Sequence, residues 1–149
     1  MANPTIPLAS LFFICAAFPL FAADISDLTY VVNPDNTNTN TITITRCDTA
    51  ASGELVIPDT IEGQPVTSID DYGAFSGCTN LTSVTIGNNV TNIGAAAFHA
   101  ATGLISVIIP DSVISIGSRA FRGCRIVVGP NYLLTSSHYP PVSRDRWVS

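Results

Sequence analysis

The sequence predicts a β-rich solenoid of about three 23-residue turns, with a short parallel sheet and an N-terminal pair of strands as its cap. Three observations support this fold class. Apolar positions recur at one fixed step, as in Phe75, Phe98 and Phe121, which are 23 residues apart. Each copy opens with the alternation of a half-buried strand, and a threonine-rich, strand-like pair of segments precedes the first copy. Because one such unit cannot bury its own apolar edge, the copies are expected to stack.

Residues 1–23 are predicted to be a secretory signal peptide. The segment from Leu8 to Phe18 is apolar and uncharged, and the small residues Ala22 and Ala23 follow it. The mature chain is therefore expected to begin at Ala23 or Asp24. No Lys or Arg precedes the apolar segment, which departs from the usual pattern. The alternative is a transmembrane anchor, which two prolines and a length of only about 18 residues disfavour. We expect a secreted or cell-surface protein with no membrane insertion once the signal is removed.

Residues 24–52 are predicted to form an N-terminal β cap. Leu28 to Val32 and Thr41 to Thr45 have the composition of two strands, with a polar turn between them. This pair is expected to cover the open apolar edge of the first turn, as solenoid caps do. Asp35 and Asn36 in the turn suggest calcium, but the six or more oxygen ligands that calcium takes are missing. A solvated turn is the better interpretation.

Residues 53–126 contain the repeats, which follow the pattern L-x-x-V-x-I-x-x-x-V-x-x-I-G-x-x-A-F. Gly94 and Gly117 come directly after the second isoleucine and mark tight turns, where only a hydrogen fits or φ is positive. The phenylalanine at the end of each copy fills the interior of the turn. The alternative is that the three rings form a ligand cage. Core packing is favoured because the rings occupy the same position in successive repeats.

The first copy is longer than the other two. About five extra residues around Glu62 to Gln64 separate its strand, ending at Ile57, from a turn at Val66 to Ile69. One further residue is inserted between Asp70 and Gly73. Inserted residues in a solenoid project from one face, so the first turn is expected to bulge without breaking the array.

The repeat strings GELVIPDTIEGQPVTSI, AFSGCTNLTSVTIG, VTNIGAAAF and VISIGSRAFRGC resemble the BspA-type leucine-rich repeats of bacterial and protist surface proteins. The similarity covers about Tyr30 to Cys124. It implies a curved solenoid with a short parallel sheet on its concave side. Some members of that family are implicated in adhesion to matrix glycoproteins or to other cells, and many have no assigned partner.

Residues 127–149 are predicted to be an irregular C-terminal tail. At the same 23-residue step, Pro130 and Arg144 would fall on core positions, and proline removes a donor from the strand ladder. The tail is either a divergent cap or the mark of a truncated gene whose longer relatives carry more repeats.

Removing the signal leaves three cysteines, Cys47, Cys78 and Cys124. The number is odd, so at least one thiol must stay free or pair between chains. Cys78 and Cys124 occupy the same position in the repeat, two turns apart. Two strand spacings are roughly 10 Å, which exceeds the limit of about 7 Å between bridged Cα atoms. We therefore predict no bond between these two cysteines, and expect both to be buried as small apolar groups.

The chain is predicted not to be an enzyme and to hold no metal or cofactor. His99 is expected at a solvated turn position and His138 lies in the tail. No nucleophile elbow or histidine–aspartate spacing is present. The cysteines and histidines lack zinc-site spacing. Asp70 and Asp71 are better explained as a solvated turn than as an acid–base pair.

The charge balance argues against nucleic acid as a partner. Eleven acidic residues face six arginines, with no lysine, for a formal net charge of −5. No basic stripe for phosphate groups can be assembled from this composition. Threonine, serine and asparagine supply most of the polar surface, a pattern that suits an exported β-rich protein.

A binding function is therefore the leading hypothesis: a non-catalytic recognition or adhesion module for an extracellular protein or glycan. The alternative is a structural surface element, or a truncated fragment of a longer repeat adhesin. The sequence leaves the oligomeric state open. A solvated sheet face that binds nothing, with residues favoured only for their β propensity, would account for the same outward-pointing residues. The candidate binding face consists of the residues expected to point outward from the repeat strands: Glu54, Val56, Thr82, Ser83, Thr85, Ile105, Ser106 and Ile108.

Overall fold

The computed structural model describes residues 22–34 and 40–126. The predicted signal peptide, apart from its last two residues, lies outside these ranges. So do the turn with Asp35 and Asn36, the predicted tail at 127–149, and His138.

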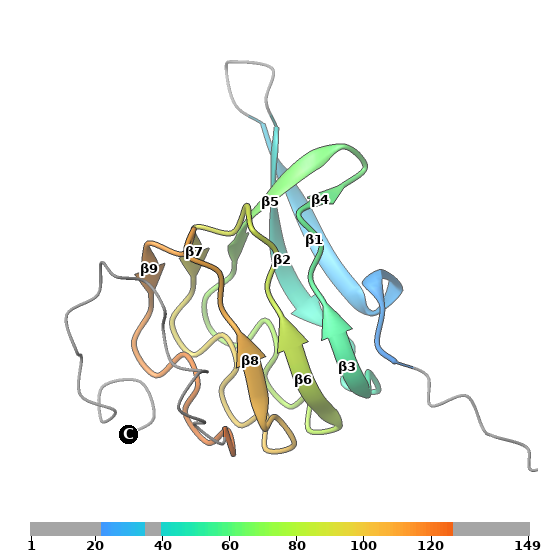
Figure 1. Cartoon of the computed structure of the whole chain (residues 1–149), viewed down its shortest axis with the longest axis vertical. Coiled ribbons are helices and arrows are strands. Elements are labelled where there is room, and N and C mark those ends of the chain that lie inside the picture. Colours follow the sequence, from blue (N-terminus) through green and yellow to red (C-terminus); the bar gives the residue numbers. More distant parts are fainter. Residues whose placement is uncertain (1–21, 35–39, 127–149) are drawn as a thin grey trace, which may run out of the picture.

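The described chain is a β-solenoid of about three turns with two sheets along its length, in which the strands of successive turns run parallel (Figure 1). One sheet has the order β3–β6–β8, formed by Gly53–Val56, Leu81–Thr85 and Ser106–Ile108. The other contains, in order, β1 (Leu28–Asn33), β2 (Thr41–Cys47), β5 (Gln64–Ile69), β7 (Asn92–Ile93) and β9 (Ser115–Ile116). Each turn of the solenoid gives one strand to each sheet, so the predicted fold class of stacked turns with parallel strands is confirmed.

The second parallel sheet corrects one prediction. Val66 to Ile69 was expected to be a turn, but these residues belong to strand β5. Both end residues of the V-x-x-I pattern are fully buried, and Ser68 between them is the register partner of Asn92 in β7. The segment is a strand because the next turn repeats the same pattern one layer away and supplies its hydrogen-bond partners.

The N-terminal strand pair extends the second sheet at its first edge. Strand β1 is antiparallel to β2, and β2 runs parallel to β5. Ile42 and Ile44 of β2 are fully buried. A short 3₁₀ turn, η1 (Ile25–Asp27), precedes β1, and Ala23 before it forms a parallel bridge with Leu55 of β3. The segment thus covers the first edge of both sheets.

The inserted residues of the first turn form a small hairpin. Strand β4 (Thr60–Ile61) pairs antiparallel with the start of β5, and Glu62 and Gly63 connect them with φ angles of 53° and 79°. Two residues with positive φ are typical of a type I′ hairpin turn. The hairpin projects from the body of the solenoid (Figure 1), so the predicted bulge is present.

The three phenylalanines form a continuous stack inside the turns. Phe75 and Phe98 have ring centroids 4.5 Å apart, and Phe98 and Phe121 have centroids 5.1 Å apart. All three are buried, which confirms core packing. Gly94 lies where a Cβ atom would be 2.5 Å from the backbone carbonyl of Asp70. The glycine is therefore required by close approach of the neighbouring turn.

Candidate functional site

The eight residues of the predicted binding face lie together on the outer face of the β3–β6–β8 sheet. Register pairing places Glu54, Ser83 and Ser106 in one row across the three strands. A second row contains Val56, Thr85 and Ile108. Thr82 and Ile105 are neighbours at the start of the sheet, where the Ile105 amide donates to the Thr82 carbonyl at 3.0 Å. The structure thus assembles one continuous surface from residues of all three turns.

The position of a side chain relative to the central buried row determines whether it points outward. Leu55, Val84 and Val107 lie in one register row and are buried. Since successive side chains of a strand point to opposite faces, the residues before and after each of them are exposed or half-buried. A register shift between Gly53 and Glu54 adjusts the start of the sheet.

The chemistry of this face is apolar and hydroxylic with little charge. Val56, Ile105 and Ile108 are 61%, 49% and 47% exposed. Four Ser and Thr side chains lie among them, and Glu54 is the one charged residue in the set. Such a surface can donate and accept hydrogen bonds while burying branched aliphatic groups. It has no arrangement of groups suited to proton transfer or nucleophilic attack.

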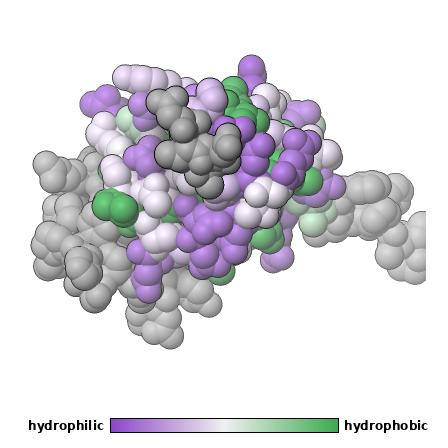
Figure 2. All heavy atoms as spheres, turned by 90° about the horizontal axis from the view of Figure 1, so that it is seen from above, coloured by the Kyte–Doolittle hydropathy of each residue, from purple (hydrophilic) through white to green (hydrophobic). Residues whose placement is uncertain are grey.

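The outer face of the second sheet was not anticipated from the sequence. Its central row contains the polar residues Thr43, Ser68, Asn92 and Ser115, which are partners across four parallel strands. At its cap end, the Asn33 side-chain amide donates to the Thr43 hydroxyl at 2.8 Å. The signal for this row was the second pattern of each repeat, V-x-x-I, which recurs with the same step as the first. Viewed from above, the described surface is mainly hydrophilic with small hydrophobic patches (Figure 2).

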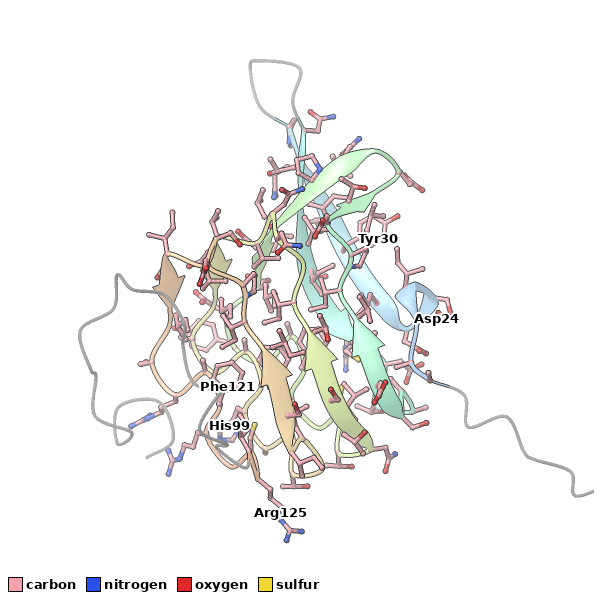
Figure 3. All side chains as sticks on the ribbon, in the orientation of Figure 1. Asp24, Tyr30, His99, Phe121 and Arg125 are labelled. Carbon is pink, nitrogen blue, oxygen red and sulfur yellow. The ribbon has the colours of Figure 1, made fainter. Side chains whose placement is uncertain are left out.

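The residues considered for chemistry are dispersed. His99 is half-buried, rather than solvated, on a turn at the lower edge, and Arg125 extends outward nearby (Figure 3). Asp71 is exposed, and its carboxylate accepts a hydrogen bond from the Ala95 amide of the next turn at 2.6 Å. That contact gives the Asp70–Asp71 turn a structural role. In the ranges 22–34 and 40–126, no three His, Cys, Asp or Glu residues cluster as metal ligands would.

The described part of the chain has no helix that is long and apolar enough to span a membrane. Its one helical element is the three-residue η1.

The chain is similar to known repeat proteins. Residues 53–128 match, in six copies, a family described as the BspA type leucine-rich repeat region. A leucine-rich repeat protein of T. pallidum is similar in structure, with 30% sequence identity and a TM-score of 0.60. That match covers 68% of this chain and 45% of the T. pallidum chain. A leucine-rich cell surface protein from Faecalibacterium prausnitzii has 32% identity and a TM-score of 0.49, covering 65% of this chain and 26% of the other. This chain therefore spans less than half the length of either solved protein. A comparison with curated proteins finds no match.

Proposed function

Because the chain belongs to the BspA-type leucine-rich-repeat family, we propose that it is an exported, non-catalytic recognition module. In this proposal the outer face of the β3–β6–β8 sheet contacts a protein or glycan outside the cell. Adhesion is the role that this activity would serve.

One observation carries the proposal: aliphatic side chains are left exposed in register with hydroxyl groups. Val56 and Ile108 flank Thr85 in the same row, and both are about half exposed or more. Exposed β-branched residues at adjacent strand positions are favourable for the sheet itself. Burying them against a partner would add apolar contact, while the serine and threonine hydroxyls satisfy polar groups of that partner. A three-strand face is small beside the roughly 800 Å² per partner of a standard interface, so weak binding is expected.

The start of the folded segment supports export with cleavage after Ala22. Ala23 is buried, pairs with Leu55, and its amide donates to the Ser52 carbonyl at 2.9 Å. Cleavage after Ala22 keeps this bridge, because the new amino terminus still donates hydrogen bonds. Mass spectrometry of exported protein should give Ala23 as the first residue. Exported protein that retains Met1 would contradict the signal-peptide proposal.

The binding proposal can be tested with the chain displayed on a multivalent support, which compensates for weak affinity. The support is applied to panels of immobilised glycans and of extracellular glycoproteins, each glycoprotein with and without enzymatic deglycosylation. Signals that persist after deglycosylation indicate a protein partner, and signals that disappear indicate a glycan.

Variants then locate the contact surface. The double variant Val56→Thr, Ile108→Thr keeps branched side chains on the strands and should lower binding at least tenfold. The matched control is Ile114→Thr, since Ile114 is 74% exposed outside this face. Equal loss in both variants, or no binding to either panel, would contradict the proposal and favour a structural surface element.

A further inference from the structure

The thiols of Cys47 and Cys78 meet in the core between the cap and the first turn. Cys47 is the last residue of β2 and Cys78 follows Phe75 in the first turn. They are 2% and 0% exposed. Each sulfur lies 3.5 Å from the same acceptor, the carbonyl oxygen of Asp48, and Cys78 Sγ is also 3.6 Å from the Cys47 carbonyl oxygen.

The backbone holds the two residues in adjacent layers. The Cys47 amide donates to the Ala74 carbonyl at 2.7 Å, one residue before Phe75. The next amide, of Asp48, donates to the Asp27 carbonyl at 2.7 Å. Cys78 itself lies in the turn and in no strand, and its place beside Cys47 is given by the shared carbonyl oxygen of Asp48, 3.5 Å from each sulfur.

The third cysteine is placed differently. Cys124 lies two turns beyond Cys78, with Ala101 at the intervening position, and its thiol donates to the Phe98 carbonyl at 3.1 Å. The three thiols of the described chain are all in the reduced form in the structure. Their positions divide them into one close pair and one isolated group.

We propose that Cys47 and Cys78 form an intrachain disulfide that ties the β cap to the first repeat turn and leaves Cys124 as the free thiol. This assignment resolves the odd number of cysteines without a bond between chains. Its presence in the cell depends on the proposed export to an oxidising compartment. Its formation in a redox buffer depends only on the geometry.

Bond formation proceeds by two exchange steps with a small disulfide such as oxidised glutathione. One thiol loses its proton and attacks a sulfur of the oxidant, releasing one glutathione thiolate and leaving a mixed disulfide. The second thiol then loses its proton and displaces the other glutathione. The two cysteines together lose two protons and two electrons, and the oxidant is reduced to two thiols.

Each of the two thiols affects the ionisation of the other. A hydrogen bond from Cys47 lowers the pKa of the Cys78 thiol, while the hydrogen bond to Cys78, followed by burial, raises the pKa of Cys47. Because both sulfurs are buried, the exchange takes place before the cap packs on the first turn or when it opens locally.

The test uses the full chain, reduced and then equilibrated with reduced and oxidised glutathione, quenched with acid, unfolded in denaturant and alkylated. Trypsin alone is insufficient, because no Lys or Arg lies between Cys47 and Arg119. A second cleavage at glutamate, using Glu54 and Glu62, separates the two cysteines. Peptides containing Cys47 and Cys78 should be joined, with alkylation of both at least tenfold lower than that of Cys124. Three fully alkylated thiols, or any crosslink to Cys124, would overturn the proposal.

Variants separate the bond from general effects on folding. Wild type and Cys124→Ala should each melt several degrees higher when oxidised than when reduced. Cys47→Ala and Cys78→Ala should show no such difference, whatever their own stability. A difference that persists in Cys47→Ala would contradict the assignment. A crosslink that forms in the buffer but is missing from protein isolated from cells would count against export and leave the pairing intact.

Discussion

The ring of Phe98 stacks on the ring of Phe75 with centroids 4.5 Å apart and planes inclined by 10°. Its other face stacks on Phe121, with centroids 5.1 Å apart and an inclination of 12°. In the described chain Phe98 is the one ring of the stack with aromatic neighbours on both sides. Since turns of a solenoid are stabilised mainly by contacts with adjacent turns, this residue couples all three.

Phe98→Ala should destabilise the array more than Phe121→Ala. Truncating a buried phenylalanine typically costs about 3–5 kcal/mol, comparable to the whole stability of a small domain. The Phe98 variant should therefore unfold most of the array, and the Phe121 variant should mainly loosen the last turn. Thermal melts followed by circular dichroism give the comparison. If Phe121→Ala proves at least as damaging, residues outside the described ranges must pack on Phe121.

Gly94→Ala should be more damaging than Gly63→Ala. A Cβ atom on Gly94 would lie 2.5 Å from backbone atoms of Asp70 and Asp71, and backbone in a stacked turn cannot move aside cheaply. Overpacking of this kind costs about 1–3 kcal/mol or more. At Gly63 no atom lies within 4 Å, but φ is 79°, so a cost of only about 1 kcal/mol is expected. Urea unfolding of both variants measures the difference, and equal costs would show that the turns can separate at Gly94.

The Cys124 thiol should react unusually slowly below about pH 9. Burial raises its pKa to about 11, whereas an unfolded thiol ionises near 8.5. The neutral thiol is thus favoured by folding, and this contribution to stability is lost as pH rises from about 9 through 11. Iodoacetamide alkylation of Cys124 in the folded protein should rise about tenfold per pH unit up to about 11. In urea the rate should level off above about pH 9. Superimposable profiles would contradict the raised pKa.

The stacking of the turns could be predicted from the sequence because it depends on the position of each residue within the repeat. Residues one repeat apart occupy the same position in successive layers, so the spacing of Phe75, Phe98 and Phe121 was sufficient to predict the stack. The second sheet was harder to see. Strands β7 and β9 contain two residues each, too few for an alternation to appear. They exist because Asn92 pairs with residues of the turns on either side.

The sequence also predicted which side chains share the outer face of β3, β6 and β8, since they lie between apolar positions that recur in each repeat. Whether that face binds a partner is a separate question, which the proposed variants address. No periodic pattern in the sequence predicted the contact between Cys47 and Cys78. Cys47 lies in the cap, outside the repeat, and the register between β2 and β5 shifts after Ile42. The distance between the two thiols depends on that packing and on no periodic pattern.

Two backbone positions in every turn are left-handed. The residues two before each phenylalanine are Gly73, Ala96 and Arg119, with φ of 102°, 56° and 59°. The residues two after it are Gly77, Ala100 and Gly123, with φ of 79°, 57° and 82°. The conformation belongs to the repeat, and the middle turn fills both positions with alanine.

Ala96→Gly and Ala100→Gly should therefore stabilise the protein. A non-glycine residue costs roughly 1–2 kcal/mol in this conformation, while glycine costs about 0.5–1 kcal/mol in chain entropy on folding. Each substitution should gain about 0.5–1 kcal/mol, and the matched control Ala95→Gly should lose about as much, because Ala95 is half-buried beside them without positive φ. Urea midpoints of the three variants decide the matter. Losses of equal size at all three positions would mean that the alanine methyl groups at 96 and 100 contribute more by packing than the left-handed backbone costs.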